Sequence, residues 1–225
     1  VYLILVFLIP LMLPENTVPE LSGRANRLDY ATHDGWSSWG NNDHGESASV
    51  GHDQSAHGGT FAWAGLNPIA AFVYAIGDLN CHQKHERSWE INGNQLAVCT
   101  RDIGIMFGFV AACILWNRRG LNRWTVRDSF LSIFKDEMVE KYYYNDQRMK
   151  VMIALLCLGL VPMAIDGFTQ LLTNYESTNL LRILTGTPAG FVVGWFFSAS
   201  FSARPHEFDD AESVQLPANA QLKLI

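Results

Sequence analysis

Charged residues are scarce in this chain of 225 residues. Lysine, arginine, aspartate and glutamate make up 17% of the sequence, whereas soluble domains usually carry about a quarter. Hydrophobic residues make up 48%, so the composition argues against an ordinary water-soluble protein. The formal net charge of -6 leaves no broad basic surface to neutralise phosphates, which argues against a nucleic-acid partner.

The common catalytic signatures are also missing. The sequence contains no serine–histidine–acid order, no phosphate-binding loop and no dinucleotide fingerprint. Motifs therefore support none of the usual enzyme classes, and whether the protein is an enzyme stays open.

Long apolar runs are what the sequence does contain. Three of them, 97–116, 151–172 and 183–203, have the roughly 20 residues that a helix needs to cross the hydrocarbon core of a bilayer. A shorter run, 1–13, is interpreted as a transmembrane helix that is truncated in this sequence. We therefore predict an all-α integral membrane bundle of about four transmembrane helices.

A fifth apolar stretch, 61–79, is interrupted by Asn67 and Pro68. The uninterrupted part is too short to span a bilayer and suits an interfacial or re-entrant helix. A crossing at this stretch is the alternative, but it would place the acidic and basic connections on the same side of the membrane. The membrane domain is predicted to cover 61–203.

The basic residues predict the orientation of the bundle. Eight of the sixteen lysines and arginines fall within 117–150, and the positive-inside rule makes that connection cytoplasmic. Its apolar residues recur at helical spacing, which predicts an amphipathic helix on the inner leaflet with arginines attracted to anionic lipid. The acidic, histidine-rich segment 14–60 is predicted to be a flexible extracytoplasmic loop, and 204–225 a disordered cytoplasmic tail. Both termini are then cytoplasmic in a multi-pass protein of the cell membrane.

Polar and reactive side chains crowd the segment 81–102, directly at a membrane entrance. Such groups are costly near hydrocarbon unless they are paired, so their density predicts a hydrogen-bonded network or a site. We interpret this segment as an extracytoplasmic cap. Its candidate residues are Cys81, His82, Gln83, Arg87, Ser88, Cys99, Arg101 and Asp102.

These residues also carry a family resemblance. The chain resembles the small multi-pass membrane proteins grouped as domain of unknown function 2085, over roughly residues 68 to 200. The resemblance implies a prokaryotic membrane protein and supplies no established activity. The matching motifs are Cys81-His82-Gln83, Arg87-Ser88, Gly93-Asn94-Gln95, Cys99-Thr100-Arg101-Asp102, Gly104-Ile105, Asp166-Gly167 with Thr169-Gln170, Asn179 with Arg182, and Thr185-Gly186.

Counting along the predicted helices brings distant residues to one depth. Arg101 lies about 22 Å from the cytoplasmic end of its helix, Asp166 about 24 Å and Thr185 about 25 Å, at 1.5 Å per residue. Three helices thus present polar residues at one level, beneath the cap. We expect Gln170, Asn179 and Thr185 to belong to the same network.

Cys81 and Cys99 have alternative interpretations. On the extracytoplasmic side they suit a disulfide, which would stabilise the cap by about 3 kcal/mol. Alternatively Cys81, His82, Cys99 and Asp102 suit a divalent metal such as zinc. Free or redox-active thiols are the third interpretation.

Arg101, Asp102, Asp166 and Arg182 also leave two interpretations open. The two acids and the two arginines cancel as structural ion pairs, or the arginines bind an anionic headgroup or substrate while Asp166 serves as a base or ligand. The first functional hypothesis is therefore a metal-supported site that acts on a lipid or another amphiphile. The second is a non-catalytic accessory or assembly subunit with a disulfide-stabilised cap. The lipid bilayer is the expected partner, together with a second copy of the chain or a membrane complex.

Overall fold

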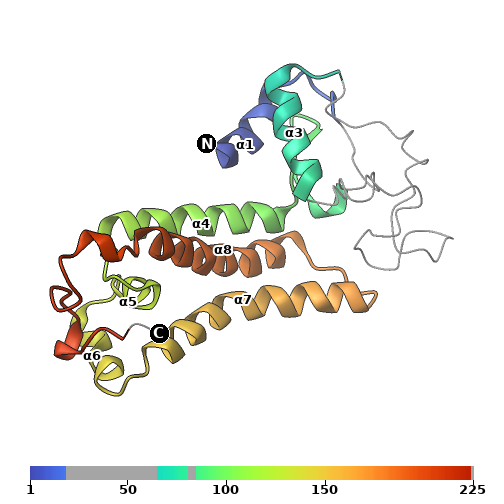
Figure 1. The fold of residues 1–225 in the computed structure, drawn as a ribbon. Coiled ribbons are helices and arrows are strands. Elements are labelled where there is room, and N and C mark those ends of the chain that lie inside the picture. The colour runs from blue at the N-terminus through green and yellow to red at the C-terminus, as the bar shows by residue number, and fades with distance from the viewer. Residues whose placement is uncertain (19–64, 81–84, 224–225) are drawn as a thin grey trace, which may run out of the picture. The chain divides into compact units, whose positions relative to one another are not determined.

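A computed structural model describes residues 1–18, 65–80 and 85–223, and Figure 1 labels its helices. This part of the chain is predominantly helical, which confirms the all-α prediction at that level. The chain divides into two compact units. Unit 1 combines Val1–Gly104 with Ala164–Gly186, and unit 2 combines Ile105–Met163 with Thr187–Ile225.

Two shorter and three longer α-helices carry most of the fold, with two very short ones between them. The α-helices of the described residues are α1 (Tyr2–Met12), α3 (Pro68–Asn80), α4 (Thr100–Arg119), α5 (Val126–Leu131), α6 (Asp136–Tyr144), α7 (Arg148–Leu172) and α8 (Asn179–Ser202). The remaining elements are the 3-10 turns η2 (His85–Arg87), η3 (Pro205–Glu207) and η4 (Pro217–Asn219) and the strands β1 (Glu90–Ile91) and β2 (Asn94–Gln95).

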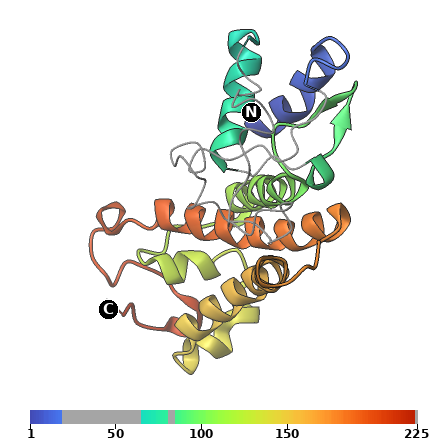
Figure 2. The same ribbon diagram turned by 90° about the vertical axis from the view of Figure 1, so that its right-hand side faces the viewer.

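In unit 1 a small hairpin joins α1 to α3, and Figure 2 shows it beside α1. The Asn94 amide donates to the carbonyls of Pro10 and Pro14, both at 3.0 Å. The Tyr74 hydroxyl of α3 donates to the Gln95 carbonyl at 2.7 Å. Because Asn94 and Gln95 are fully buried, these bonds satisfy polar groups that would otherwise be costly to bury.

The hairpin turns at Asn92 and Gly93. Both have positive φ, 55° and 65°, which is the conformation that an Asn-Gly pair adopts in a tight turn between antiparallel strands. A Cβ on Gly93 would lie 2.4 Å from the Asn16 side-chain oxygen. The turn therefore requires glycine for both its backbone angle and its close approach to Asn16.

In unit 2 the parts of α4 and α8 that belong to it run side by side (Figures 1 and 2). A Cβ on Gly190 would lie 1.9 Å from the Ile105 carbonyl oxygen, and one on Gly108 would lie 2.0 Å from the Thr187 carbonyl oxygen. Only glycine lets the backbones approach so closely, as is common between helices in membranes.

The aromatic core of unit 2 includes the chain after α8. Trp195 stacks on Phe130 with ring centroids 4.0 Å apart and donates to the Phe130 carbonyl at 2.9 Å. Val214 and Leu216 are buried in the same core. The expectation of a disordered tail is therefore wrong for these residues, because two apolar side chains of the tail pack against α5 and α6.

Arginines of the connection 117–150 form a buried cluster in unit 2. The Arg148 guanidinium donates to Asp128 at 3.1 Å, and Arg127 forms an ion pair with the same carboxylate at 3.6 Å. Asp128 is 0% exposed, and Arg123, Arg127 and Arg148 are all buried. The expectation that these three arginines reach anionic lipid is wrong, because the fold turns them toward carboxylates of their own unit.

Two helices of the described residues, α7 and α8, are long and apolar enough to cross a membrane. Along α7 half of the large apolar side chains are exposed, among them Ile153, Leu158 and Phe168. Apolar side chains that no described residue covers suit contact with lipid or another protein. The other two predicted crossings lie in α1, which has 11 residues, and α4, which carries four charged residues near its ends.

Candidate functional site

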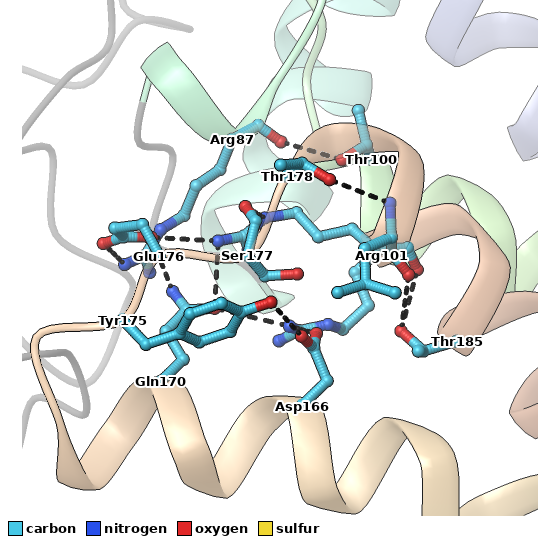
Figure 3. Close-up of polar contacts among 12 residues, drawn as sticks. Arg87, Thr100, Arg101, Asp166, Gln170, Tyr175, Glu176, Ser177, Thr178 and Thr185 are labelled. Carbon is cyan, nitrogen blue, oxygen red and sulfur yellow. Dashed lines mark hydrogen bonds and ion pairs between the residues drawn. The ribbon is translucent and has the colours of Figure 1, made fainter.

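Polar side chains from five segments of unit 1 meet at one place, shown in Figure 3. We call the set the arginine cluster. Its members are Arg87 from η2, Arg101 from the first turn of α4, Asp166 and Gln170 from α7, Glu176 from the α7–α8 connection, and Arg182 from the first turn of α8.

Arg101 and Asp166 form an ion pair between α4 and α7. The Arg101 guanidinium also donates to the side-chain oxygen of Gln170 at 3.4 Å. The Tyr175 hydroxyl donates to the second carboxylate oxygen of Asp166 at 3.4 Å. Asp166 is buried, so its carboxylate has little access to water. Because both of its carboxylate oxygens already accept hydrogen bonds, Asp166 is better placed to fix the position of Arg101 than to transfer a proton.

Glu176 accepts hydrogen bonds from three other members of the cluster. Arg87 donates to one carboxylate oxygen at 2.5 Å. Arg182 and Gln170 donate to the other oxygen at 3.1 and 3.0 Å. The arrangement is a cradle for a planar carboxylate, the group that guanidinium ions bind with the best geometry.

Arg182 is the best-anchored arginine of the cluster. Its Nε donates to the backbone carbonyl of Ser177 at 2.9 Å, and its Nη2 also donates to the side-chain oxygen of Gln170 at 2.9 Å. The side chain is only 2% exposed. A cation that is buried to this extent is unfavourable without such partners. The contacts also hold the guanidinium in one orientation.

A second set of contacts fixes the segment around η2 to the ends of α4 and α8. Thr100 donates to the Asn179 side-chain oxygen at 2.9 Å, and the Asn179 amide donates to the Ser88 carbonyl at 3.4 Å. The Ser88 hydroxyl donates to the Val98 carbonyl at 2.9 Å. These bonds hold the segment that carries Arg87 against the starts of α4 and α8, so that Arg87 can join the cluster.

Several other residues singled out from the sequence are not among the members of the arginine cluster as defined above. The Thr185 hydroxyl donates to the Leu181 carbonyl at 2.8 Å, so it satisfies its own helix and makes no bond to a side chain of the cluster among the described residues. Cys99 is buried and Asp102 is half-buried at the start of α4. Cys81, His82 and Gln83 lie outside the described residues.

The metal and disulfide interpretations both depend on Cys81, so each of them stays a prediction. Within residues 1–18, 65–80 and 85–223 no group of three or more histidine, cysteine, aspartate or glutamate side chains is arranged to hold a metal ion. The contacts of the arginine cluster instead join guanidinium groups to carboxylates and amides, and cationic guanidinium groups are not zinc ligands.

Sequence reasoning missed Glu176, Tyr175 and Ser177. They lie in the short connection 173–178 between two apolar helices. Polar residues are common in such loops, so these three did not stand out in the sequence. Their place in the sequence could have indicated this role. The connection joins the helix end that carries Gln170 to the helix end that carries Arg182, so an acidic residue in it lies within reach of both.

Comparison with known proteins agrees with this membrane setting. The family model described as "Predicted membrane protein (DUF2085)" matches residues 81–196. An uncharacterised protein of Methanocaldococcus jannaschii is 33% identical over 133 residues, which cover 59% of this chain and 70% of that protein. A second uncharacterised protein, of Methanothermobacter thermautotrophicus, is 34% identical over 110 residues, 49% of this chain and 77% of that protein. No solved structure matches the chain.

Proposed function

The chain belongs to the DUF2085 family of predicted membrane proteins, and from that premise we propose that it is a multi-pass membrane protein that binds an anionic amphiphile at the arginine cluster. The bound group would be a phosphate or carboxylate, held at the ends of α4, α7 and α8. The observation that carries the proposal is that Arg87 and Arg182, from distant segments, converge on a single carboxylate.

The charges of the cluster support an anion as the ligand. Its ion pairs join three guanidinium groups to the two carboxylates of Asp166 and Glu176. The N-termini of α4 and α8 lie here too, beside Arg101 and Arg182, and helix N-termini carry partial positive charge that favours anions.

The setting supports an amphiphile rather than a small soluble anion. The cluster lies at the ends of α7 and α8, the two helices long and apolar enough to span a membrane. Exposed apolar residues flank it on both helices, including Phe168, Leu172 and Leu184. A headgroup bound at Glu176 would have acyl chains beside these side chains.

Binding of short-chain lipids to the purified full chain in neutral detergent tests the proposal. We expect dioctanoyl phosphatidylglycerol to bind at least about fivefold more tightly than dioctanoyl phosphatidylcholine, as a charge-assisted contact of roughly 1 kcal/mol implies. Arg87→Gln should abolish the difference, whereas the exposed Arg118 offers a matched control, Arg118→Gln, that keeps it. Equal affinity of the wild-type chain for both lipids would reject anion binding and favour the accessory-subunit hypothesis.

Membrane sidedness is tested separately. The charge distribution of the sequence predicts that the 173–178 connection lies outside the cell and the 117–150 connection inside. Thr173→Cys should therefore react with a membrane-impermeant thiol reagent on intact cells, and Lys135→Cys only after lysis, with the labelled peptide identified by mass spectrometry. Both positions are exposed, so labelling of Lys135→Cys from outside would contradict this orientation.

A further inference from the structure

Glu176 occupies the place where the proposed ligand would bind. We infer that its carboxylate is an internal ligand of the anion site, which an incoming phosphate group displaces. The inference rests on the proposed function and adds which group neutralises the arginines when no amphiphile is bound.

The donors and the acceptor of the cradle differ in exposure. Arg87, Gln170 and Arg182 are all buried, whereas the Glu176 side chain is 40% exposed. Glu176 also lies on the connection between two helices and not within one. It can leave the cradle by a change of side-chain rotamer, while the donors stay enclosed by the helices that carry them.

Two of the three donors, Arg182 and Gln170, have partners other than Glu176. Arg182 is held by the Ser177 carbonyl and by Gln170, and Gln170 accepts from Arg101, which Asp166 anchors in turn. Figure 3 labels Arg101, Asp166 and Gln170 and marks contacts among the residues drawn with dashed lines. A preorganised set of donors loses little conformational freedom when it binds a new anion.

Charge favours an exchange of anions over an empty cradle. The Arg182 guanidinium is buried, so an anion beside it is more favourable than its absence. The phosphodiester of a phospholipid offers two charged oxygens, as a carboxylate does, and inorganic phosphate offers more. Next to Glu176, the buried Ser177 hydroxyl has no hydrogen-bond partner among the described residues, and it provides a further donor for one of these oxygens.

Glu176→Gln tests the inference because it keeps the size of the side chain and removes its charge. We expect this variant of the full chain to bind dioctanoyl phosphatidylglycerol roughly five- to tenfold more tightly than the wild type in isothermal titration calorimetry, since the competitor forms ion pairs of modest strength. Binding of dioctanoyl phosphatidylcholine should not change. Glu140→Gln, which removes the same charge from an exposed position on α6, is the matched control and should leave both affinities unchanged.

Inorganic phosphate is the second ligand to titrate. A gain for phosphate as well as for the anionic lipid assigns the site to the phosphate group itself, and a gain for the lipid alone assigns it to the headgroup together with its chains. Glu176→Asp, which keeps the charge but shortens the side chain, should give a smaller gain and serves if Glu176→Gln does not fold.

The two proposals fail differently. If wild type binds the anionic lipid selectively and neither Glu176 variant binds it more tightly, Glu176 is not a competitor and only the present inference is overturned. If neither the wild type nor the variants discriminate between the two lipids, the anion site itself is rejected.

Discussion

Each unit of the molecule has two arginines that converge on one carboxylate, and the two carboxylates differ in exposure. In unit 2, Arg127 and Arg148 meet Asp128, which is 0% exposed. In unit 1, Arg87 and Arg182 meet Glu176, which is 40% exposed. The residue types are closely similar, so the access of water to the carboxylate is what separates a structural ion pair from an exchangeable ligand.

Local structure explains the difference. Asp128 lies in the first turn of α5, where it also accepts from the Thr125 hydroxyl at 2.6 Å, and its backbone N–H donates back to Thr125 at 3.0 Å. The capping pair fixes the carboxylate within a helix. Glu176 lies in the connection between α7 and α8, outside any helical turn. Asp128 therefore cannot move without disturbing α5, whereas Glu176 can.

Asp128→Asn should produce the largest effect. The substitution leaves two buried guanidinium groups with one fewer counter-charge, which costs about 3–5 kcal/mol of the free energy of unfolding. Thermal unfolding in detergent, or the yield of monodisperse protein, measures the loss. A variant as stable as the wild type would show that Asp128 is as dispensable as we expect Glu176 to be.

Asp166→Asn is expected to have an intermediate effect. The carboxylate is buried, but its partner Arg101 keeps 19% of its side chain exposed, so water compensates part of the lost ion pair. We expect a loss of about 1–3 kcal/mol. If Asp166 were instead a catalytic base with no structural role, the unfolding transition would not move.

Glu176→Gln is expected to change the stability of the ligand-free protein by less than about 1 kcal/mol. The amide oxygen of the introduced glutamine could still accept from the arginines of the cradle, so the charge is lost but a hydrogen bond is kept. The same unfolding assay as for Asp128→Asn gives the comparison directly. A loss as large as that of Asp128→Asn would make Glu176 a structural residue and remove the contrast between the units.

Asp146→Asn should have the smallest effect, and it is best seen by its pH dependence. Hydrogen bonds from Lys223 and then Arg148 lower the pKa of Asp146 in the folded protein. A lowered pKa stabilises the fold above the unfolded-state pKa, and this contribution disappears as the pH falls through the folded-state value. Hydrogen exchange of residues 205–223, corrected for the intrinsic rate at each pH, should therefore show a greater loss of protection on acidification in the wild type than in Asp146→Asn. An equal loss in both would show that Asp146 does not hold the tail.

Sequence reasoning reached one of the two carboxylate clusters in part and missed the other. Helical rise brought Arg101, Asp166 and Thr185 to one level, and of these Arg101 and Asp166 meet in the structure, whereas Thr185 bonds its own helix. The same reasoning treated Arg127 and Arg148 as lipid-facing charges, because positive charge in a connection between apolar helices has that role by default. Their burial depends on Asp128 and on the packing of α5 and of the tail, which no local pattern encodes.

The sequence by itself determined the class of the protein and the level of its polar residues, because apolar length, charge scarcity and helical rise act locally along the chain. Only the tertiary structure decided which arginine meets which carboxylate and how exposed each carboxylate is. Side-chain exposure depends on every segment that packs around it, and the segments around Glu176 and Asp128 come from distant parts of the sequence.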